Sequence, residues 1–305
     1  MNEREKSRLD ELYQKHVRAL KLHGYADKTI EAYSLAVRRV AEQLDRCPDH
    51  LTREELETYF VDLVASHSWS TVKLDRNGLR FFYENVVGRT LPWINLIKAP
   101  VIKSLPDVLT QQEIARIVLR TEERRFQTFW FVTYTLGLRL SETLHLEVGD
   151  IDGEQRRVHV RRGKGNRDRF VILPKLTLVA LRRHWTSHRH PRLLFPGRVG
   201  GAGAPASGVM DRSTTQHAFK RVVADCGIHK HVSIHSLRHA YATHLIEAGL
   251  NLRAIQEQLG HANPTTTARY VRMTEKSRGD GAAIIDGMVA TLAAALRLAR
   301  TEPRS

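Results

Sequence analysis

The chain has 305 residues, of which 42% are hydrophobic and 27% charged, a balance typical of a folded globular protein. That length is too great for one ordinary small core and favours two domains. Lysine and arginine outnumber aspartate and glutamate by 48 to 33, and the formal charge of +15 favours a polyanionic partner, most simply nucleic acid, although a basic protein can also merely stay in solution.

The two cysteines, Cys47 and Cys226, lie far apart and in no CxxC motif, which excludes a disulfide framework and a zinc-ligand spacing. The N-terminal residues MNEREKSRLDELYQKHV are charged throughout and do not form a secretory signal. No stretch approaches the roughly 18 apolar residues that a membrane-spanning helix needs. We therefore expect a cytoplasmic protein without a membrane partner.

Residues 5–95 show only helical patterns. An apolar stripe with i, i+3, i+4, i+7 spacing runs through residues 29–44. Thr52 and Glu55 have the spacing of a capping box at the start of another helix, and a further helix is expected from about Ser70 to Val86. These signals predict a compact bundle of four or five helices in residues 1–97.

The segment from Pro92 to Thr110, PWINLIKAPVIKSLPDVLT, contains three prolines and little periodicity. Because proline cannot continue a helix and restricts the residue before it, this segment predicts a linker, which we place at residues 98–108. Thr110 and Glu113 then form a second predicted capping box. A second domain is therefore expected over residues 109–305.

The second domain is predicted to be mainly helical with a small β-hairpin, an α+β arrangement. Residues 157–161 alternate with a period of two, residues 169–173 are rich in β-formers, and the glycine-rich turn between them carries Lys164 near its tip. Residues 197–208 predict a surface loop, after which helices resume, with Asn251 and Asn263 as expected N-caps. The apolar face of residues 284–298 either completes the core or docks on a neighbouring subunit.

Several residues in the second domain are of types that can bind a phosphodiester or attack it. Arg139 follows the helix-breaking Gly137, and Glu142 at i+3 is placed to hold its guanidinium. His235 and Arg238 are three residues apart and share one face of a helix. Taken singly, each of these residues also has an ordinary interpretation. Arg139 with Glu142, and His235 with Arg238, can be surface pairs, and Lys164 can be a solvated residue at a loop tip. His261 can be a helix-capping histidine, and Tyr270 can be a half-buried aromatic residue.

The order of four short sequence motifs decides between the catalytic and the ordinary interpretations. GLRLSE, GKGNRDR, HSLRHAYATHL and LGHANPTTTARY follow one another along the chain. Together they resemble the catalytic domain of the tyrosine recombinase (phage integrase) family over residues ~105–275. Residues ~10–95, with GYADKTIEAY, resemble the helical, SAM-like core-binding domain of that family.

The resemblance implies a role for each of the six residues. Arg139 and Arg238 would bind the phosphate, and Tyr270 would be the nucleophile. The other three residues, Lys164, His235 and His261, would assist the reaction. A tyrosine is a poor nucleophile until a base takes its proton, and His235 has a suitable unperturbed pKa. Glu142 would support the arginines, and Tyr241, although close in sequence to the HSLR motif, is expected to pack in the core.

By the same resemblance, the chain is a site-specific recombinase that cleaves and rejoins DNA through a 3′-phosphotyrosine, with no metal, ATP or other cofactor. Its partners would be double-stranded DNA with inverted-repeat half-sites and copies of itself, two on each site and four in the synapse. The departing 5′-oxygen needs a general acid, which Lys164 on the hairpin tip would supply.

Three alternatives compete with this interpretation. A metal site at His235, His239 and His244 is disfavoured because the run lacks the glutamate of HExxH and Arg238 would repel the ion. A type IB topoisomerase-like enzyme would share the arginines, lysine and tyrosine but relax DNA as a monomer. A catalytically idle DNA-binding protein of the same fold would not need all six residues.

Overall fold

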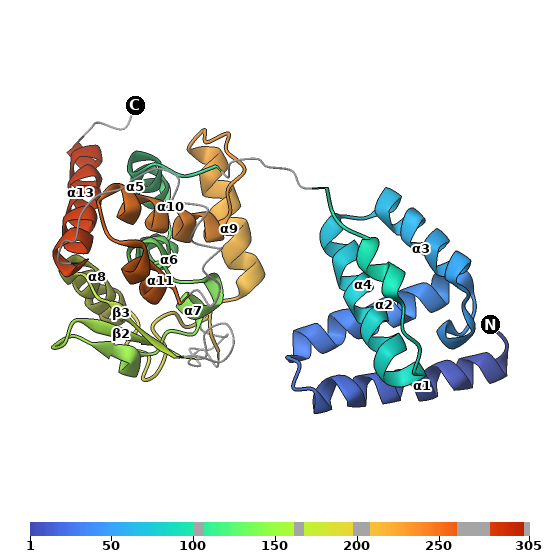
Figure 1. Cartoon of the computed structure of the whole chain (residues 1–305). Coiled ribbons are helices and arrows are strands. Elements are labelled where there is room, and N and C mark those ends of the chain that lie inside the picture. The colour runs from blue at the N-terminus through green and yellow to red at the C-terminus, as the bar shows by residue number, and fades with distance from the viewer. Residues whose placement is uncertain (101–106, 162–167, 198–207, 261–280, 302–305) are drawn as a thin grey trace. The chain divides into compact units, whose positions relative to one another are not determined.

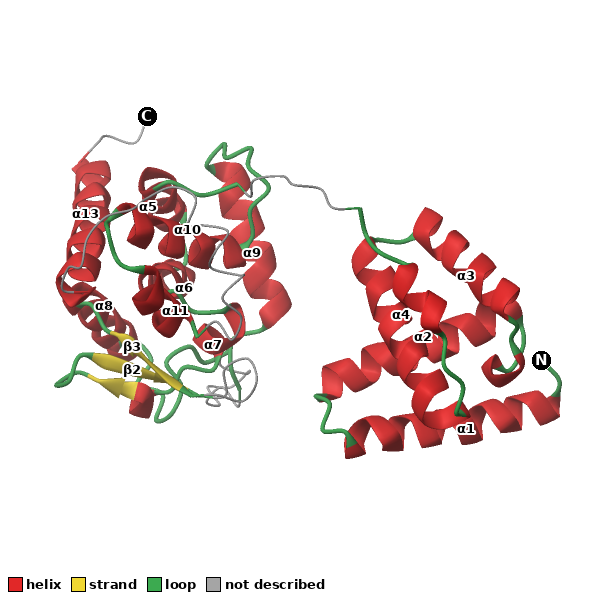
Figure 2. Ribbon diagram, viewed as in Figure 1, coloured by secondary structure: helices red, strands yellow, loops and turns green. Residues whose placement is uncertain are grey.

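The computed structural model describes residues 1–100, 107–161, 168–197, 208–260 and 281–301. The chain divides into two compact units, Met1–Ser104 and Leu105–Ser305, and this boundary falls within the linker expected at residues 98–108. The fold is mainly helical with one small antiparallel sheet, as predicted (Figure 2). Among the described residues, no helix combines the length and the apolarity that crossing a bilayer requires.

The first unit is a bundle of four α-helices (Figure 1). They are α1 (Glu3–Leu22), α2 (Asp27–Leu44), α3 (Arg53–Ser66) and α4 (Trp69–Phe82), followed by a π-helical turn at Tyr83–Val87. The predicted capping box is present, because the Thr52 side chain accepts a hydrogen bond from the Glu55 N–H and the Glu55 carboxylate accepts one from the Thr52 N–H. The box satisfies backbone N–H groups that a helix start leaves without intrahelical partners.

A buried carboxylate links three helices of this bundle. Asp75 on α4 accepts hydrogen bonds from the Arg39 guanidinium on α2 at 2.6 Å and from the Tyr59 hydroxyl on α3 at 2.5 Å. Because an unpaired buried charge would be strongly destabilising, the three groups hold one another in a single arrangement.

The proline-rich segment that starts at Pro92 shows little periodicity in sequence, yet its first residues are ordered. Pro92–Leu96 forms a 3₁₀ helix that buries Ile94 in the core of this unit. The start of the segment therefore lies in the first unit, before the linker expected at residues 98–108.

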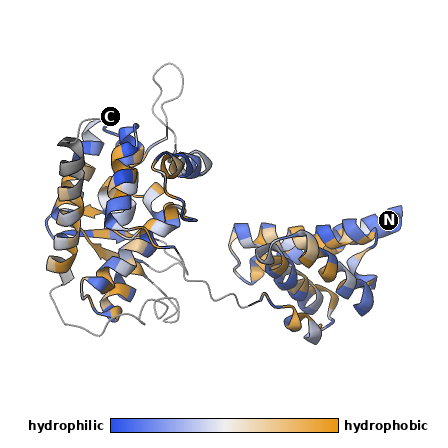
Figure 3. Cartoon of the chain, turned by 90° about the horizontal axis from the view of Figure 1, so that it is seen from above, coloured by the Kyte–Doolittle hydropathy of each residue, from blue (hydrophilic) through white to orange (hydrophobic). Residues whose placement is uncertain are grey.

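The second unit surrounds an apolar helix with other helices and covers one side with the sheet (Figures 1 and 2). Its helices are α5 (Gln111–Arg120), α6 (Arg124–Thr135), α7 (Leu140–Leu144), α8 (Lys175–Thr186), α9 (Arg212–Asp225), α10 (Ile234–Glu247), α11 (Leu252–Leu259) and α13 (Gly281–Thr301). Helix α6 is buried through most of its length and contacts α5, α8 and α10. Helices of both units carry apolar and polar residues on different faces, as Figure 3 shows.

The predicted hairpin is present as two strands of a three-stranded antiparallel sheet. The strands β1 (Ile151–Asp152), β2 (Arg157–Val160) and β3 (Arg169–Ile172) lie in the order β1-β2-β3. Val158 pairs with Val171, and both side chains are buried against the helices. Alternate residues of β2 and β3 therefore point inward, and Arg169 shares the inward face with Val171. Lys164 lies outside the described residues.

The apolar tail forms α13, and its described part packs on its own unit. Ile285, Met288, Val289 and Leu292 are buried against the same core as α5 and α10. Asp286 on this helix accepts hydrogen bonds from the Arg156 guanidinium at 2.8 Å and from the Lys175 N–H at 3.3 Å. Of the two possibilities left open by the sequence, this arrangement completes the core.

A buried histidine makes the stability of the first unit dependent on pH. His16 lies against Phe81 and Phe82 with no solvent exposure, and this burial lowers the pKa of His16 to about 4. The unfolded chain therefore binds a proton below its ordinary pKa of about 6.5, whereas the folded chain does not until about pH 4.

Stability should therefore fall as the pH drops from about 6.5 towards 4, by at most ~1.4 kcal/mol per pH unit for this one group. Denaturant unfolding of the full chain, followed by circular dichroism, measures the effect. His16→Leu should lose less stability than the wild type between pH ~7 and ~5, because leucine does not titrate. An identical pH dependence in the two proteins would contradict a role for His16.

Candidate active site

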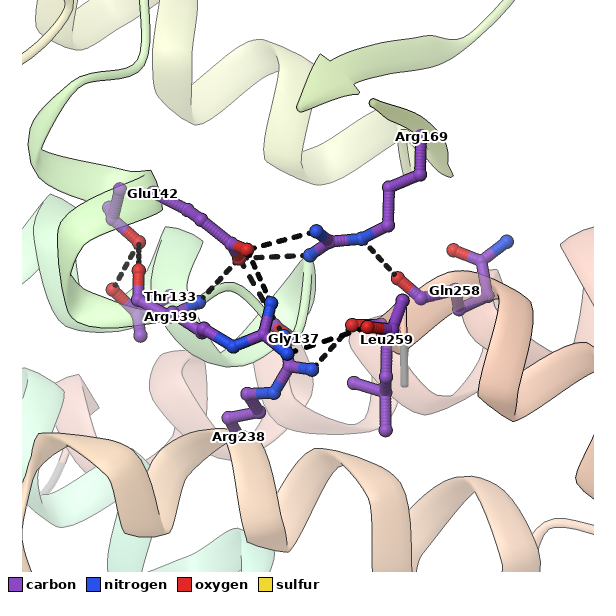
Figure 4. Close-up of polar contacts among 10 residues, drawn as sticks. Thr133, Gly137, Arg139, Glu142, Arg169, Arg238, Gln258 and Leu259 are labelled. Carbon is purple, nitrogen blue, oxygen red and sulfur yellow. Dashed lines mark hydrogen bonds and ion pairs between the residues drawn. The ribbon is translucent and has the colours of Figure 1, made fainter. Parts of the chain in front are cut away.

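The carboxylate of Glu142 lies at the centre of the candidate site (Figure 4). Its two oxygens accept hydrogen bonds from Arg139 Nη1 at 2.7 Å and from the Arg139 backbone N–H at 2.8 Å. Arg169 donates to both oxygens at 2.9 Å, and Arg238 Nη1 lies 3.6 Å from one of them. One acidic side chain therefore gathers three arginines that are far apart in the sequence.

The local chain path puts Arg139 in this position. Gly137 ends the helical path after α6 with φ +60°, and Leu138 N–H bonds back to the carbonyl of Thr133. Arg139 then becomes the N-cap residue of α7, and Glu142 reaches back to its N–H. The prediction that Glu142 holds the Arg139 guanidinium is confirmed.

The C-terminal end of α11 supplies the second set of partners. Its last carbonyl groups have no intrahelical donors and carry the negative end of the helix dipole. Arg169 Nε donates to the Gln258 carbonyl at 3.0 Å, Arg238 Nη2 donates to the Leu259 carbonyl, and Arg139 Nη2 lies 3.5 Å from the Gly260 carbonyl. Three successive carbonyls thus each receive a different arginine.

Two glycines are needed for this close packing. A Cβ atom on Gly137 would lie 2.4 Å from the ring of Tyr241, and one on Gly260 would lie 2.7 Å from Cδ of Arg169. Both residues also have φ of +60°, a left-handed conformation that disfavours side chains. The Gly137 carbonyl accepts a hydrogen bond from Arg238 Nη1 at 2.8 Å, so the glycine also positions an acceptor for the site.

The electrostatics of the site follow from these contacts. Burial alone would raise the pKa of Glu142, but the hydrogen bonds from Arg169 and the Arg139 N–H, with the charge of Arg238, lower it to about 2. Glu142 is therefore ionised at neutral pH. Three guanidinium groups against one carboxylate leave these four side chains with a net charge of +2.

His235 and Arg238 both come from α10, as predicted. His235 is at the surface, and its ring meets that of His239 edge-on at 4.6 Å. Partial desolvation, followed by electrostatic interactions with His239, Arg238 and Arg139, lowers the pKa of His235 to about 4. The imidazole is therefore neutral at neutral pH and can accept a proton.

The structure brings together Arg139, Glu142, His235 and Arg238. Arg139 keeps 22% of its side chain exposed, whereas Arg238 keeps only 2%. His261 and Tyr270 lie outside the described residues, as does Lys164. His261 directly follows Gly260, whose carbonyl lies next to Arg139.

Sequence reasoning missed Arg169. The available signal was its place in β3, because alternation puts residue 169 on the same inward face as Val171. An arginine directed into a protein core requires a carboxylate or backbone carbonyls as partners. Tyr241, in contrast, is fully buried in the core, which confirms the expectation that it packs.

Comparison with known proteins identifies the family. The profile of the phage integrase family matches residues 107–277, and that of the phage integrase N-terminal SAM-like domain matches residues 12–93. The chain is 32% identical over 259 residues to putative integrase/recombinase y4qK of Sinorhizobium fredii, which covers 83% of this chain and 82% of that protein. It is 29% identical over 297 residues to tyrosine recombinase XerA of Thermococcus onnurineus, covering 92% and 98% of the two chains.

Solved structures agree on the fold. A lambda integrase dimer bound to a COC′ core site has a TM-score of 0.69 at 17% identity, over 89% of this chain and 98% of that one. XerH bound to its difH substrate has a TM-score of 0.64 at 20% identity, over 81% and 76% of the two chains. The chain therefore belongs to the phage integrase family of tyrosine-type site-specific recombinases, enzymes that break and rejoin DNA.

Gly137→Ala should both destabilise the protein and slow DNA cleavage. The added Cβ would displace the Tyr241 ring and the carbonyl that accepts from Arg238, so we expect a loss of ~3 kcal/mol or more in unfolding free energy. Gly88→Ala is the matched control, because Gly88 has φ +78° but no atom within 4 Å of the place that a Cβ would occupy, and should cost only ~1–2 kcal/mol. Equal losses of stability in the two variants, measured by denaturant unfolding, would contradict this role for Gly137.

Proposed function

We propose that the chain cuts one DNA strand by attack of the Tyr270 hydroxyl on a phosphodiester bound by Arg139 and Arg238. The P–O5′ bond breaks, the 5′-oxygen leaves as a hydroxyl, and the DNA stays joined to the enzyme as a 3′-phosphotyrosine. The observation that carries this proposal is the assembly of both arginines around Glu142, at the helix end that leads directly into His261.

The two arginines suit a phosphate in complementary ways. Guanidinium groups donate forked hydrogen bonds to the non-bridging oxygens, where negative charge accumulates during phosphoryl transfer. The 3.5 Å contact between Arg139 and the Gly260 carbonyl is long for a hydrogen bond, so a phosphate oxygen can replace it at little cost. Arg238 donates hydrogen bonds to the backbone carbonyls of Gly137 and Leu259, which fix its position before DNA binds.

His235 is the proposed acceptor of the tyrosine proton. In the DNA-free protein desolvation, with the neighbouring positive charges, keeps its imidazole neutral, which is the form that accepts a proton. A bound phosphate brings negative charge next to the ring, and negative charge stabilises the imidazolium. DNA binding therefore raises the basicity of His235 at the stage when a base is needed.

Elimination among the tyrosines supports Tyr270 as nucleophile. Residues 105–305 contain three tyrosines, Tyr134, Tyr241 and Tyr270. Tyr134 and Tyr241 are both fully buried, and burial raises the pKa of each hydroxyl above its ordinary value. Neither can reach a phosphodiester at the surface, so within the second unit Tyr270 is the remaining candidate.

The other two proposed groups complete the proton balance. Lys164, which lies between β2 and β3 in the sequence, would give a proton to the leaving 5′-oxygen, and His261 would donate a further hydrogen bond to the phosphate. Religation is the reverse reaction, in which the 5′-hydroxyl attacks the phosphotyrosine. Because the ester retains the bond energy, the cycle needs neither ATP nor metal.

The assembly proposed for this reaction has two copies on each DNA site and four in the synapse. Residues 1–97 would bind DNA as a core-binding domain and residues 109–305 would cut it, with residues 98–108 joining them. The formal charge of +15 supports an extensive contact with the DNA backbone. A lambda integrase of the same fold is a dimer on its core site, which supports binding to paired half-sites.

Tyr270→Phe should abolish the covalent protein–DNA adduct on a nicked suicide substrate while DNA binding is retained, because only the nucleophilic oxygen is removed. A denaturing gel detects the adduct and a mobility shift measures binding. Tyr241→Phe is the matched control, because its hydroxyl has no hydrogen-bond partner in the part of the chain that the structure describes. The control should form the adduct. An adduct with Tyr270→Phe would overturn the assignment of the nucleophile.

A further inference from the structure

Arg169 contacts Glu142 through both terminal nitrogens of its guanidinium group. Its two terminal nitrogens donate to the two carboxylate oxygens at 2.9 Å each, which is the parallel fork that matches guanidinium to carboxylate. Its remaining nitrogen, Nε, donates to the Gln258 carbonyl at 3.0 Å. All three nitrogens of this guanidinium are therefore used inside the protein (Figure 4).

The partners of Arg169 distinguish it from the two arginines proposed to bind phosphate. Arg238 is even less exposed, at 2% against 9%, but its terminal nitrogens donate to two neutral backbone carbonyls and Nη1 lies 3.6 Å from the carboxylate. Arg169 directs both terminal nitrogens at the carboxylate itself, from the inward face of β3. Each of the three nitrogens of Arg169 thus has an acceptor on Glu142 or on α11, so Arg169 acts on the reaction through Glu142 and the end of α11.

We infer that Arg169 is a positioning residue that neutralises Glu142, so that Glu142 can orient Arg139 and Arg238 without cancelling their attraction for the DNA phosphate. This inference rests on the proposed function, in which those two arginines bind the phosphate. It assigns to the chain a further functional side chain of the reaction, beyond Glu142 and the six residues implied by the sequence motifs.

Charge balance explains why a third arginine is needed. With Arg169 in place, the fork from β3 balances the carboxylate, and the charges of Arg139 and Arg238 remain to attract phosphate. Without it, the carboxylate would be balanced by the same two arginines, and the net charge of the group would fall from +2 to +1. In a water-poor site such a change strongly weakens the binding of developing negative charge.

The same side chain connects three segments of the proposed site. Arg169 begins β3, five residues after Lys164 in the sequence, and it contacts α7 through Glu142 and α11 through Gln258. A second bond joins β3 to α11, from the Ile172 N–H to the Gln258 side chain at 3.0 Å. The close approach of Arg169 to Gly260 leaves no space for a larger residue at position 260.

A charge-rescue experiment tests the inference. The rate of single-turnover cleavage is measured on the suicide substrate for the full chain, Arg169→Gln, Glu142→Gln and the double variant. We expect Arg169→Gln to slow cleavage roughly tenfold or more. Adding Glu142→Gln should then restore the rate by about threefold or more, because the unbalanced carboxylate is gone. Losses that simply add in the double variant would overturn the inference.

The pH dependence supplies a readout that a purely structural role would not move. Among the described residues, the charged or titratable groups that face Glu142 are Arg139, Arg169, Arg238 and His235. Removing Arg169 takes away the largest cause that lowers the pKa of Glu142, so that Glu142 gains a proton at higher pH than in the wild type. The ratio of the wild-type to the Arg169→Gln rate should therefore shrink as the pH falls, because protonation removes the unbalanced charge. A constant ratio would contradict neutralisation.

Two further variants separate local neutralisation from a general effect of charge. Arg169→Lys keeps the charge without the fork, so it should cleave faster than Arg169→Gln, and its ratio to the wild type should not change with pH. Arg157→Gln removes an equal charge from the outer face of the same sheet, where Arg157 pairs with Asp152, and should change the rate by less than about threefold. Equal slowing by Arg157→Gln and Arg169→Gln would show an effect of overall charge only.

Failure of the inference about Arg169 can be distinguished from failure of the proposed function. If Arg139→Gln cleaves at the wild-type rate, the phosphate-binding role of Arg139 fails whatever the Arg169 series gives. If Arg139→Gln is inactive but Arg169→Gln cleaves normally while its melting temperature shows that it is folded, only the inference about Arg169 fails. If Arg169→Gln does not fold, the test is the comparison of Arg169→Lys with the wild type. A ratio of their cleavage rates that changes with pH would contradict the inference.

Discussion

The convergence of three arginines on Glu142 and on the C-terminal carbonyls of α11 is the interaction on which the catalytic unit depends. The carboxylate and the helix end are the two negative features of a positive site, and the guanidinium groups contact both. Burial makes the arrangement rigid, because any of these charges left unpaired away from water would cost several kcal/mol. The arginines are therefore in place before a phosphate arrives.

This arrangement also explains how distant parts of the chain form one site. Arg139 comes from the turn after α6, Arg238 from α10 and Arg169 from β3, and each contacts a different carbonyl of residues 258–260. Helix α11 is thus fixed at its C-terminal end by the same groups that form the site. In the sequence His261 directly follows Gly260, and Tyr270 comes nine residues later. Preorganised positive charge of this kind stabilises the negative charge that develops during phosphoryl transfer.

Much of this could be predicted from the sequence because the signals were local. Capping boxes at Thr52 and Thr110, the alternation of residues 157–161 and the pairing of Arg139 with Glu142 all depend on residues at most four apart. The role of Arg169 was missed because its partner is 27 residues away and its acceptor on α11 is 89 residues away. The burial of Ile94 was missed for a related reason, since proline marks a break in a helix but does not show whether the chain then leaves the core.

The most direct test of preorganisation is whether the arginine side chains are ordered without DNA. Side-chain ¹⁵N NMR measures rotation of each guanidinium group in the DNA-free protein, with the exposed Arg212 as the internal reference. If Glu142 and α11 preorganise the site, Arg169 and Arg238 should rotate slowly and Arg212 rapidly, and Glu142→Gln should speed the rotation of Arg169. Rapid rotation of Arg169 and Arg238 until DNA is added would contradict preorganisation by Glu142 and α11.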